Sequence, residues 1–361
     1  MTLPSQKKLQ SLGVVLFNLG GPDCPAAVKP FLKNLFSDPA IIRLPAAGRR
    51  LLAWLIATLR AEKTKRIYRQ VGGASPLREA TERQARALGQ MLDGLAEQVR
   101  VFYFMRYWHP LTEEAVAKIN CFDPDRLLLI PLYPQFSTTT TGTSTKAFVD
   151  EAKRRGVRAE IETTCCYPVN RGFVDAMAAR IRVALQAAAA HGKPRLLLSA
   201  HGLPQRIIAS GDPYQWQVES TCQAIIASLD IPDLDWVTCY QSRLGPVRWI
   251  GPHTNDEIRR AGRDGVPVVV APVAFVSENV ETLVEIEIEY RHLAERIGVP
   301  AFHNVPAVGD DPIFISGLAD LVRELLRARA ANCDRFGRRC PATFAACPQR
   351  ALASEMAERC D

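Results

Sequence analysis

Eight short apolar segments, rich in β-branched residues, alternate with longer stretches of helical periodicity, and this alternation constrains the fold most. The apolar segments span residues 13–19, 99–104, 126–132 and 157–162 in the first half of the chain, and 195–200, 236–240, 267–271 and 299–303 in the second. The helical patterns include residues 81–95, 170–190, 212–229 and 279–297. Uninterrupted apolar strands between helices are typical of parallel sheets that helices cover on both faces. We therefore predict an α/β fold with four parallel strands in each half.

Length and composition exclude several classes of protein. The 361 residues favour two domains or one two-lobed unit, at roughly 150 residues per domain. Apolar residues make up 47% of the chain, which is too many for a disordered protein, and no apolar run approaches the roughly 18 residues of a membrane-spanning helix. The N-terminus leads into the first strand without a signal-peptide core, so we expect a cytoplasmic protein. Neither phosphate-binding motif, G-x-G-x-x-G or G-x-x-x-x-G-K-[ST], occurs, so no nucleotide cofactor is expected.

Positive charge is concentrated in one segment. The net charge is +7, and residues 43–70 contain eight basic residues and one acidic residue, so the remainder is neutral in sum. Within this segment, residues 51–59 read LLAWLIATL. Two interpretations stay open: a helix on an anionic membrane surface or at the mouth of a site, and a core helix with solvated basic ends. Nucleic acid is not expected as a partner, because the basic residues are not interleaved with aromatic residues.

Ligands of open α/β sheets bind beyond the carboxyl ends of the strands, so functional residues are expected directly after the predicted strands. His201 directly follows an apolar strand in the sequence SAHGLP, where Gly202 permits a tight turn. A histidine there is suited to accept a proton near neutral pH or to bind a metal ion. A structural hydrogen bond is the competing interpretation. We favour function because His201 has the most site-like position among the six histidines.

An acidic run follows the seventh strand. Glu281, Glu285 and Glu289 recur at every fourth residue, so a helix that begins near Ser277 would place three carboxylates on one face. Like charges at that spacing cost roughly 0.2–0.5 kcal/mol per pair, so solvent, cations or protons should compensate. A solvated acidic face is the usual explanation of such a run. The functional alternative is a ladder of carboxylates that passes divalent cations or protons.

Other strand ends carry residues that suit a large, flat, carboxylated ligand. Arg106 suits a carboxylate, and Tyr107 suits a planar ring. Ser137 lies in a run of hydroxyl side chains that fits the polar rim of a pocket, and Trp249 lies beside glycine and proline, where it could stack on a ring. The competing interpretation is that these loops cap the core. Together the residues indicate a cleft for such a ring, with His201 facing the acidic helix.

The ten cysteines are unevenly distributed. Four of them follow the last helical pattern: Cys333, Cys340, Cys347 and Cys360. In a cytoplasmic chain such a cluster more often binds a metal or an iron–sulfur cluster than forms disulfides. The tail has no C-x-x-C pair, so a structural zinc site has little support.

Blocks of sequence along the chain resemble the ferrochelatases. The blocks are NLGGP (18–22), GGASPL (72–77), RYWHPLT (106–112), LYPQFSTTTTG (132–142), SAHGLP (199–204), GDPY (211–214), CYQSRLGP (239–246) and the run 272–290. The resemblance spans residues 13–325 in one register. It implies two Rossmann-like domains, each with a four-stranded parallel sheet flanked by helices, and an active-site cleft between them. The activity it implies is insertion of Fe(II) into protoporphyrin IX, the last step of haem biosynthesis, with protoporphyrin and ferrous iron as substrates.

The resemblance also implies roles for single residues. His201 would accept pyrrole protons or bind the metal, Glu281 would face it across the ring, and Glu285 would come next along the metal path. The porphyrin would be lined by Leu19, Arg106, Tyr107, Ser137 and Trp249. Asn279 is expected near the substrate, but it departs from the family pattern, because many relatives carry a histidine there. If that histidine assists metal delivery or proton removal, Glu281 or water must substitute here.

The cysteine-rich tail resembles an extension that holds a [2Fe–2S] cluster in some ferrochelatases. In those proteins three C-terminal cysteines join one cysteine from the middle of the chain. Cys340 and Cys347 fit the bacterial spacing, and Cys166 fits the ligand from mid-chain. The last cysteine of the usual C-x-C pair is replaced by Gln349. Cys333 or Cys360 would therefore have to supply the missing thiolate.

The resemblance sets the remaining expectations. We expect an N-terminal domain at residues 10–166 with a lip helix, a C-terminal domain at 167–310, a returning helix at 311–331 and the tail at 332–361. Coproporphyrin III as substrate, a chelatase for cobalt, nickel or a corrin precursor, and a non-catalytic haem or metal carrier on the same fold are the alternatives. Monomer and homodimer both stay open, as does peripheral contact with the inner face of the membrane through residues 51–59.

Overall fold

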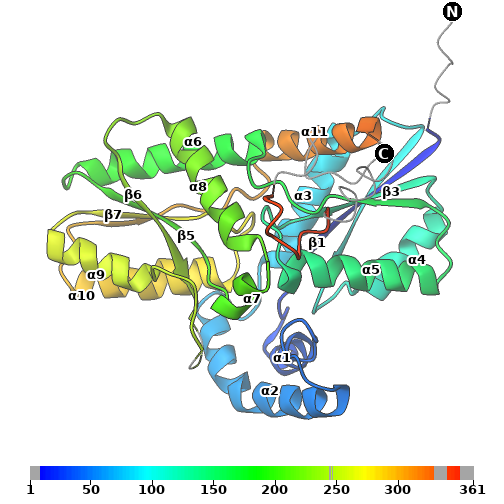
Figure 1. Ribbon diagram of the computed structural model, residues 1–361, viewed down its shortest axis with the longest axis horizontal. Coiled ribbons are helices and arrows are strands. Elements are labelled where there is room, and N and C mark those ends of the chain that lie inside the picture. Colours follow the sequence, from blue (N-terminus) through cyan, green and yellow to red (C-terminus); the bar gives the residue numbers. More distant parts are fainter. Residues whose placement is uncertain (1–8, 244, 246, 329–339, 350–361) are drawn as a thin grey trace, which may run out of the picture.

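The computed structural model describes residues 9–243, 245, 247–328 and 340–349, and within these it contains two four-stranded sheets (Figure 1). The first has the order β2-β1-β3-β4 and consists of β1 (Ser11–Asn18), β2 (Gln98–Met105), β3 (Arg126–Pro131) and β4 (Glu160–Thr163). The second has the order β6-β5-β7-β8 and consists of β5 (Arg195–His201), β6 (Asp235–Gln241), β7 (Val268–Pro272) and β8 (Phe302–Asn304). All neighbouring strands are parallel. The predicted fold is confirmed.

Burial explains why the central strands lack polar alternation. Every residue of β7 is buried, and in β1 every residue after Ser11 is buried. Both faces of each sheet are covered by helices, so apolar side chains on either face are removed from water. In the first half the helices are α1 (Val28–Phe36), α2 (Ala46–Arg69), α3 (Leu77–Met91), α4 (Thr112–Phe122) and α5 (Thr143–Arg154). In the second half they are α6 (Arg171–Ala189), α7 (Gln205–Ala209), α8 (Tyr214–Leu229), α9 (Thr254–Asp264), α10 (Arg291–Arg296) and α11 (Pro312–Ala328).

One continuous apolar core joins the two sheets. It includes Leu16 of β1, Leu198 of β5 and Phe314 of α11, each 0% exposed. Helix α11 packs on both α6 and α3, and in Figure 1 it runs along the upper side of the molecule. A Cβ atom at Gly172 of α6 would lie 2.7 Å from the Cα of Gly317 in α11, so these two helices approach as closely as glycine allows. The halves are therefore held together by packing as well as by the chain.

The acidic segment differs from its prediction. Residues Glu281–Tyr290 form a π-helix, which α10 continues, and not an α-helix. Its first N–H groups are capped by Asn279, whose Oδ1 accepts from the backbone nitrogens of Glu281 (2.7 Å) and Thr282 (3.2 Å). Ser277, the predicted cap, instead donates its hydroxyl to Gln84 of α3. A second π-helix, Thr138–Gly142, follows β3.

Helix α2 bears on the two interpretations of the basic segment. With α1 it lies below the sheets in Figure 1, and its buried side consists of Ala53, Ala57 and Ala61, with Tyr68 near its end. The opposite side exposes four large apolar side chains: Leu51 (67%), Trp54 (49%), Leu55 (44%) and Leu59 (73%). The interpretation as a core helix is therefore wrong for these residues. Among the described residues, no helix is long and apolar enough to span a bilayer.

Candidate active site

The structure brings His201 and Glu281 together from two elements of the second half. His201 is the last residue of β5, and Glu281 is the first residue of the π-helix that follows β7. The imidazole Nδ1 and the carboxylate Oε1 are 3.3 Å apart, and about a third of each side chain remains exposed. Burial by itself lowers the pKa of His201, but the interactions with Glu281 and, to a lesser extent, with Glu285 together outweigh it, so the pKa is raised above its usual value. Burial opposes ionisation of Glu281 as well, but the charge of His201 and its hydrogen bonding to the carboxylate together hold the pKa of Glu281 below its usual value.

The turn after β5 fixes the backbone at His201. Its carbonyl accepts a hydrogen bond of 2.9 Å from the hydroxyl of Tyr214, the first residue of α8. The next residue, Gly202, donates its N–H to the carbonyl of Gln241. A Cβ atom at Gly202 would lie 2.9 Å from that carbonyl and 3.3 Å from Cε3 of Trp249. Glycine therefore allows the predicted aromatic residue, Trp249, to pack directly beside the catalytic candidate.

Glu285 lies on the same π-helix in a different environment. Its carboxylate accepts from the Ser242 backbone N–H (2.9 Å) and hydroxyl, and from the Tyr290 hydroxyl (2.8 Å). Burial, and to a lesser extent the charge of Glu281, raises the pKa of Glu285 above its usual value. Glu289 is exposed. The interpretation as a solvated acidic face thus holds for Glu289 and is wrong for Glu281 and Glu285, which have partners.

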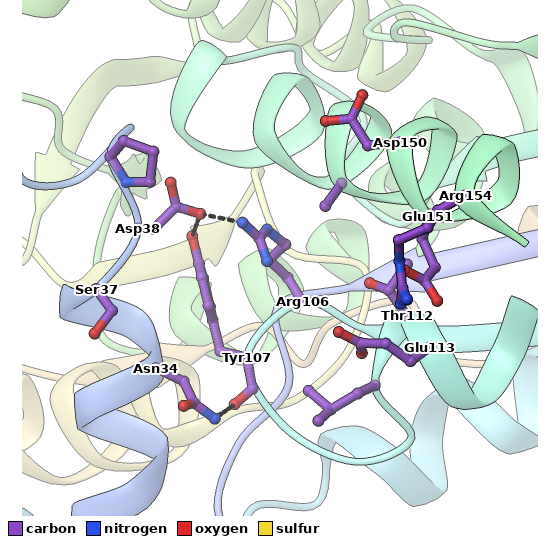
Figure 2. A pocket seen from close by; sticks show the side chains of 13 residues that line it. Asn34, Ser37, Asp38, Arg106, Tyr107, Thr112, Glu113, Asp150, Glu151 and Arg154 are labelled. Atoms are coloured by element: carbon purple, nitrogen blue, oxygen red, sulfur yellow. Dashed lines mark hydrogen bonds and ion pairs between the residues drawn. The ribbon is translucent and has the colours of Figure 1, made fainter. Parts of the chain in front are cut away.

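Arg106 and Tyr107 line a pocket of about 430 Å³ that opens beside α1, α4 and α5 (Figure 2). Both point toward Asp38, whose side chain is 1% exposed. Asp38 Oδ2 accepts from Arg106 Nη2 (2.7 Å), the Tyr107 hydroxyl (3.0 Å) and the Thr143 hydroxyl (2.7 Å). Sequence reasoning missed Asp38, because a single aspartate after a helix has no motif that distinguishes it from a solvated residue.

Three further residues that are predicted to contact the substrate make contacts within the protein. Leu19 packs in one apolar cluster with Tyr107 and Val280, the residue before Glu281. Asn279 caps the π-helix, as described above. Ser137 is 1% exposed and donates its hydroxyl to Asp212 over 3.1 Å, so its side chain joins the two halves of the chain. Their contacts with a substrate stay predictions.

Two of the predicted cluster cysteines, Cys166 and Cys340, lie against the same side chain. Cys166, Cys340 and Cys347 are all buried. The amide Nε2 of Gln217, on α8, donates to the sulfurs of Cys166 (3.3 Å) and Cys340 (3.1 Å). Cys333 and Cys360 lie outside the described residues. Among the described residues, no group of three or more His, Cys, Asp or Glu side chains is arranged to hold a metal ion.

Comparison with known proteins decides the family. The sequence profile described as Ferrochelatase matches residues 11–326. The chain belongs to the ferrochelatase family. Ferrochelatases of Caulobacter vibrioides and Hyphomonas neptunium are 51% and 46% identical to it, with 96% and 94% of this chain and 99% and 95% of theirs covered. The ferrochelatase of Rickettsia bellii is 42% identical over 93% of this chain and 94% of its own.

The family assignment from sequence motifs is therefore confirmed, and ferrochelatases are lyases that insert metal into a porphyrin. The chain also resembles a solved structure, SirB from Bacillus subtilis with Fe3+. The TM-score is 0.54 at 12% identity, and the alignment covers 90% of this chain and 99% of SirB. At that identity the likeness concerns the fold alone.

Proposed function

We propose that this ferrochelatase inserts Fe(II) into protoporphyrin IX, with release of two protons, at a site formed by His201 and Glu281. The observation that carries the proposal is the 3.3 Å pair at the carboxyl end of β5, in a chain of the ferrochelatase family. The carboxyl ends of parallel strands are where α/β sheets bind ligands. No nucleotide takes part in the reaction.

The pair has the chemistry that metal insertion requires. Two pyrrole N–H protons must leave the ring, and a raised pKa makes the His201 imidazole a better proton acceptor. The imidazolium that forms is stabilised by the carboxylate of Glu281. A pocket that binds a bent porphyrin more tightly than a flat one would direct the nitrogen lone pairs toward the metal. His201 and Glu281 therefore act as base and counter-ion.

Glu285 and Glu289 extend the site toward solvent. Carboxylate oxygens suit protons and hydrated ferrous iron alike. The half-buried, hydrogen-bonded Glu285 follows Glu281 along the π-helix, and the exposed Glu289 comes next. We assign metal contacts to His201, Glu281 and Glu285. This path serves either delivery of Fe(II) or removal of protons.

On the substrate side we assign porphyrin contacts to Leu19, Tyr107 and Trp249, and a propionate contact to Arg106. The buried Asp38 accepts hydrogen bonds from Arg106, Tyr107 and Thr143. These bonds hold the side chains of Arg106 and Tyr107 in place before a ligand arrives. We also propose that Ser137 and Asn279 contact the porphyrin.

We propose that the chain is divided into domains at residues 10–166 and 167–310, followed by a helix at 311–331 and a tail at 332–361. Each half then contributes one sheet.

An anaerobic assay tests the activity. Purified protein is mixed with Fe(II) and either protoporphyrin IX or coproporphyrin III, and metalloporphyrin formation is followed by absorbance. We expect turnover with protoporphyrin IX. In His201→Ala we expect turnover to fall at least about a hundredfold, as for loss of a general base, while porphyrin binding persists. Turnover with coproporphyrin III alone would identify the other substrate, and binding without turnover would identify a carrier.

Two cysteines, one from the middle of the chain and one from the tail, support the proposal of an iron–sulfur site. A [2Fe–2S] cluster takes four thiolates, and N–H donors commonly point at its sulfurs. The Gln217 amide between Cys166 and Cys340 matches that pattern. We propose that Cys166, Cys340 and Cys347 bind such a cluster with a fourth thiolate from Cys333 or Cys360.

Iron and acid-labile sulfide analysis of anaerobically purified protein tests the cluster. Equal amounts of both, with visible absorption that Cys340→Ser abolishes, support it. Cys121→Ser, which changes an exposed cysteine of α4, should leave the absorption unchanged. Wild-type protein without iron and sulfide would contradict it.

The exposed side of α2 fits the surface of a membrane. Leu51, Trp54, Leu55 and Leu59 form an apolar stripe, and exposed arginines and lysines, among them Arg43, Arg50, Lys63, Arg66 and Arg69, lie along the same segment. An apolar stripe with basic flanks binds anionic interfaces. We propose that α2 rests on an anionic bilayer.

A further inference from the structure

The loop Gly211–Tyr214, between α7 and α8, contacts three parts of the molecule that are distant in sequence. One is the described part of the tail, residues 340–349. Another is the hydroxyl-rich turn after β3. The third is the carbonyl of His201. Each contact is made by a different residue of the loop.

Gly211 makes the contact with the tail. The backbone N–H of Ala346 donates to its carbonyl over 3.1 Å. A Cβ atom at position 211 would lie 2.8 Å from the nitrogen of Ala345, and Gly211 has a φ of +89°, so the tail packs where only glycine fits. The rings of Phe344 in the tail and Trp216 in α8 are 6.1 Å apart between centroids.

Asp212 makes the contact with the first half of the chain. It is 0% exposed, and its Oδ2 accepts from the backbone N–H and hydroxyl of Thr138 (both 2.8 Å) and from the hydroxyl of Ser137 (3.1 Å). Its Oδ1 accepts from the backbone N–H of Tyr214 over 3.0 Å. This carboxylate therefore fixes the loop against the end of β3 and orients the start of α8.

Tyr214 makes the contact with β5, the strand that ends at His201. The residue is 7% exposed, and its hydroxyl donates to the His201 carbonyl over 2.9 Å. The bond holds the backbone of His201 and leaves the imidazole free to face Glu281. A shift of α8 would therefore move the imidazole relative to that carboxylate.

We propose that Tyr214 is a positioning residue for His201, and that the loop Gly211–Tyr214 transmits the position of the tail to the catalytic strand. The inference rests on the proposed role of His201. The contacts form one chain of packed and hydrogen-bonded groups, from the tail through Gly211, Asp212 and Tyr214 to His201. Energetic coupling between distant sites can be carried by such a chain of packed and hydrogen-bonded groups.

Tyr214→Phe tests the positioning role, because it removes one hydroxyl and keeps the ring. We expect kcat to fall about fivefold, the size expected for one hydrogen bond, while KM for the porphyrin stays unchanged. Tyr240→Phe is the matched control. Tyr240 is 2% exposed on β6, pairs with Ala200 beside His201, and its hydroxyl has no hydrogen-bond partner among the described residues. Equal kcat values in the two variants would overturn the proposal.

Phe344→Ala tests the coupling, because it removes the ring that faces Trp216. We expect it to lower kcat in the wild type and in Tyr240→Phe, and by a much smaller factor in Tyr214→Phe. Non-additivity of this kind measures coupling between residues. If Phe344→Ala lowered kcat by the same factor in the wild type, in Tyr240→Phe and in Tyr214→Phe, or did not lower it in the wild type, the proposed coupling between the tail and β5 would be overturned.

His201→Ala separates this inference from the proposed function. Turnover that survives His201→Ala would remove the role of His201 itself. Turnover that is lost in His201→Ala but stays at the wild-type level in Tyr214→Phe would remove only the positioning role. The two failures are therefore distinguishable in one set of assays.

Discussion

The Nδ1 atom of His201 and the Oε1 atom of Glu281 lie 3.3 Å apart, and each residue shifts the pKa of the other toward its charged form. The pair joins the end of a central strand to the first turn of a π-helix. This geometry gives the proposed base a counter-ion within contact distance.

Glu281→Gln should lower the pKa of His201, because the neutral amide keeps the shape of the side chain and removes its charge. The unpaired imidazole is then left with the effect of burial, which lowers its pKa. We expect the acid limb of the kcat/KM profile to move to lower pH and kcat to fall. Titration of 15N-labelled histidine by NMR measures the pKa directly. An unchanged pKa in the variant would refute the coupling.

The same pair should make stability depend on pH in two windows. Because the folded pKa of His201 is raised, its contribution is present below the ordinary histidine value and is lost as the pH rises through the folded value. Because the folded pKa of Glu281 is lowered, its contribution is present above the ordinary glutamate value and is lost as the pH falls through the folded value. Urea unfolding of the wild type and Glu281→Gln across both windows checks this, and parallel curves would contradict it.

Glu285→Gln should flatten the dependence of stability on pH. The raised pKa of Glu285 means that the folded state prefers its neutral form, so wild-type stability falls as the pH rises through that range. Glutamine cannot ionise and removes this loss. We expect a smaller decrease in the free energy of unfolding as the pH rises above the ordinary glutamate value, together with slower turnover. Glu289→Gln, at an exposed position, is the control and should follow the wild-type curve.

Asp38→Ala should destabilise the fold by roughly 3 kcal/mol, because it leaves the guanidinium of Arg106 without its buried partner. Asp150→Ala is the control from the same pocket. Its side chain is 60% exposed and pairs with Lys146 on the surface, so we expect less than about 0.5 kcal/mol. Denaturant unfolding of both variants measures the difference. Similar losses in the two would argue against a buried anchor.

Asn279→Ala should lower the free energy of unfolding by about 1 kcal/mol, because two N–H groups at the start of the π-helix lose their acceptor. Asn279→Asp keeps an acceptor and should stay near the wild type. Asn279→His tests the departure from the family pattern. If it raises kcat above that of Asn279→Ala, an imidazole at this position assists the reaction. Unfolding and turnover are measured on the same samples.

Leu51→Glu combined with Leu59→Glu should weaken binding to anionic phospholipid vesicles at least about tenfold, since two apolar side chains no longer enter the interface. Val183→Glu is the control. Val183 is 68% exposed on α6, and Figure 1 shows α6 on the opposite side of the molecule from α2. Vesicle flotation with anionic and with neutral lipid measures binding. Equal binding of the double variant and Val183→Glu would rule out the α2 surface.

The sequence alone determined the strands and their grouping into halves, because burial on both faces of a parallel sheet demands uninterrupted apolar segments. The predicted bounds of a strand agree closely with the observed bounds where burial ends sharply. An example is β3, which was predicted at 126–132 and is observed at Arg126–Pro131. They were poorer for β4, predicted at 157–162 and observed at Glu160–Thr163, where the burial pattern is mixed. The motifs also singled out His201 and Glu281 as candidates, because both stand in blocks that resemble one family, and the structure places the two side chains 3.3 Å apart.

Only the tertiary structure decided which side chains meet. The contacts of Asp38 with Arg106 and of Tyr214 with His201 join residues from different elements, and local patterns of sequence contain no information about such pairs. The π-helix was also beyond prediction, since π-helices are rare and usually occur as short interruptions of α-helices, so a helical pattern is interpreted as α. Periodicity is set by the neighbours along the chain, whereas a site is set by packing between elements.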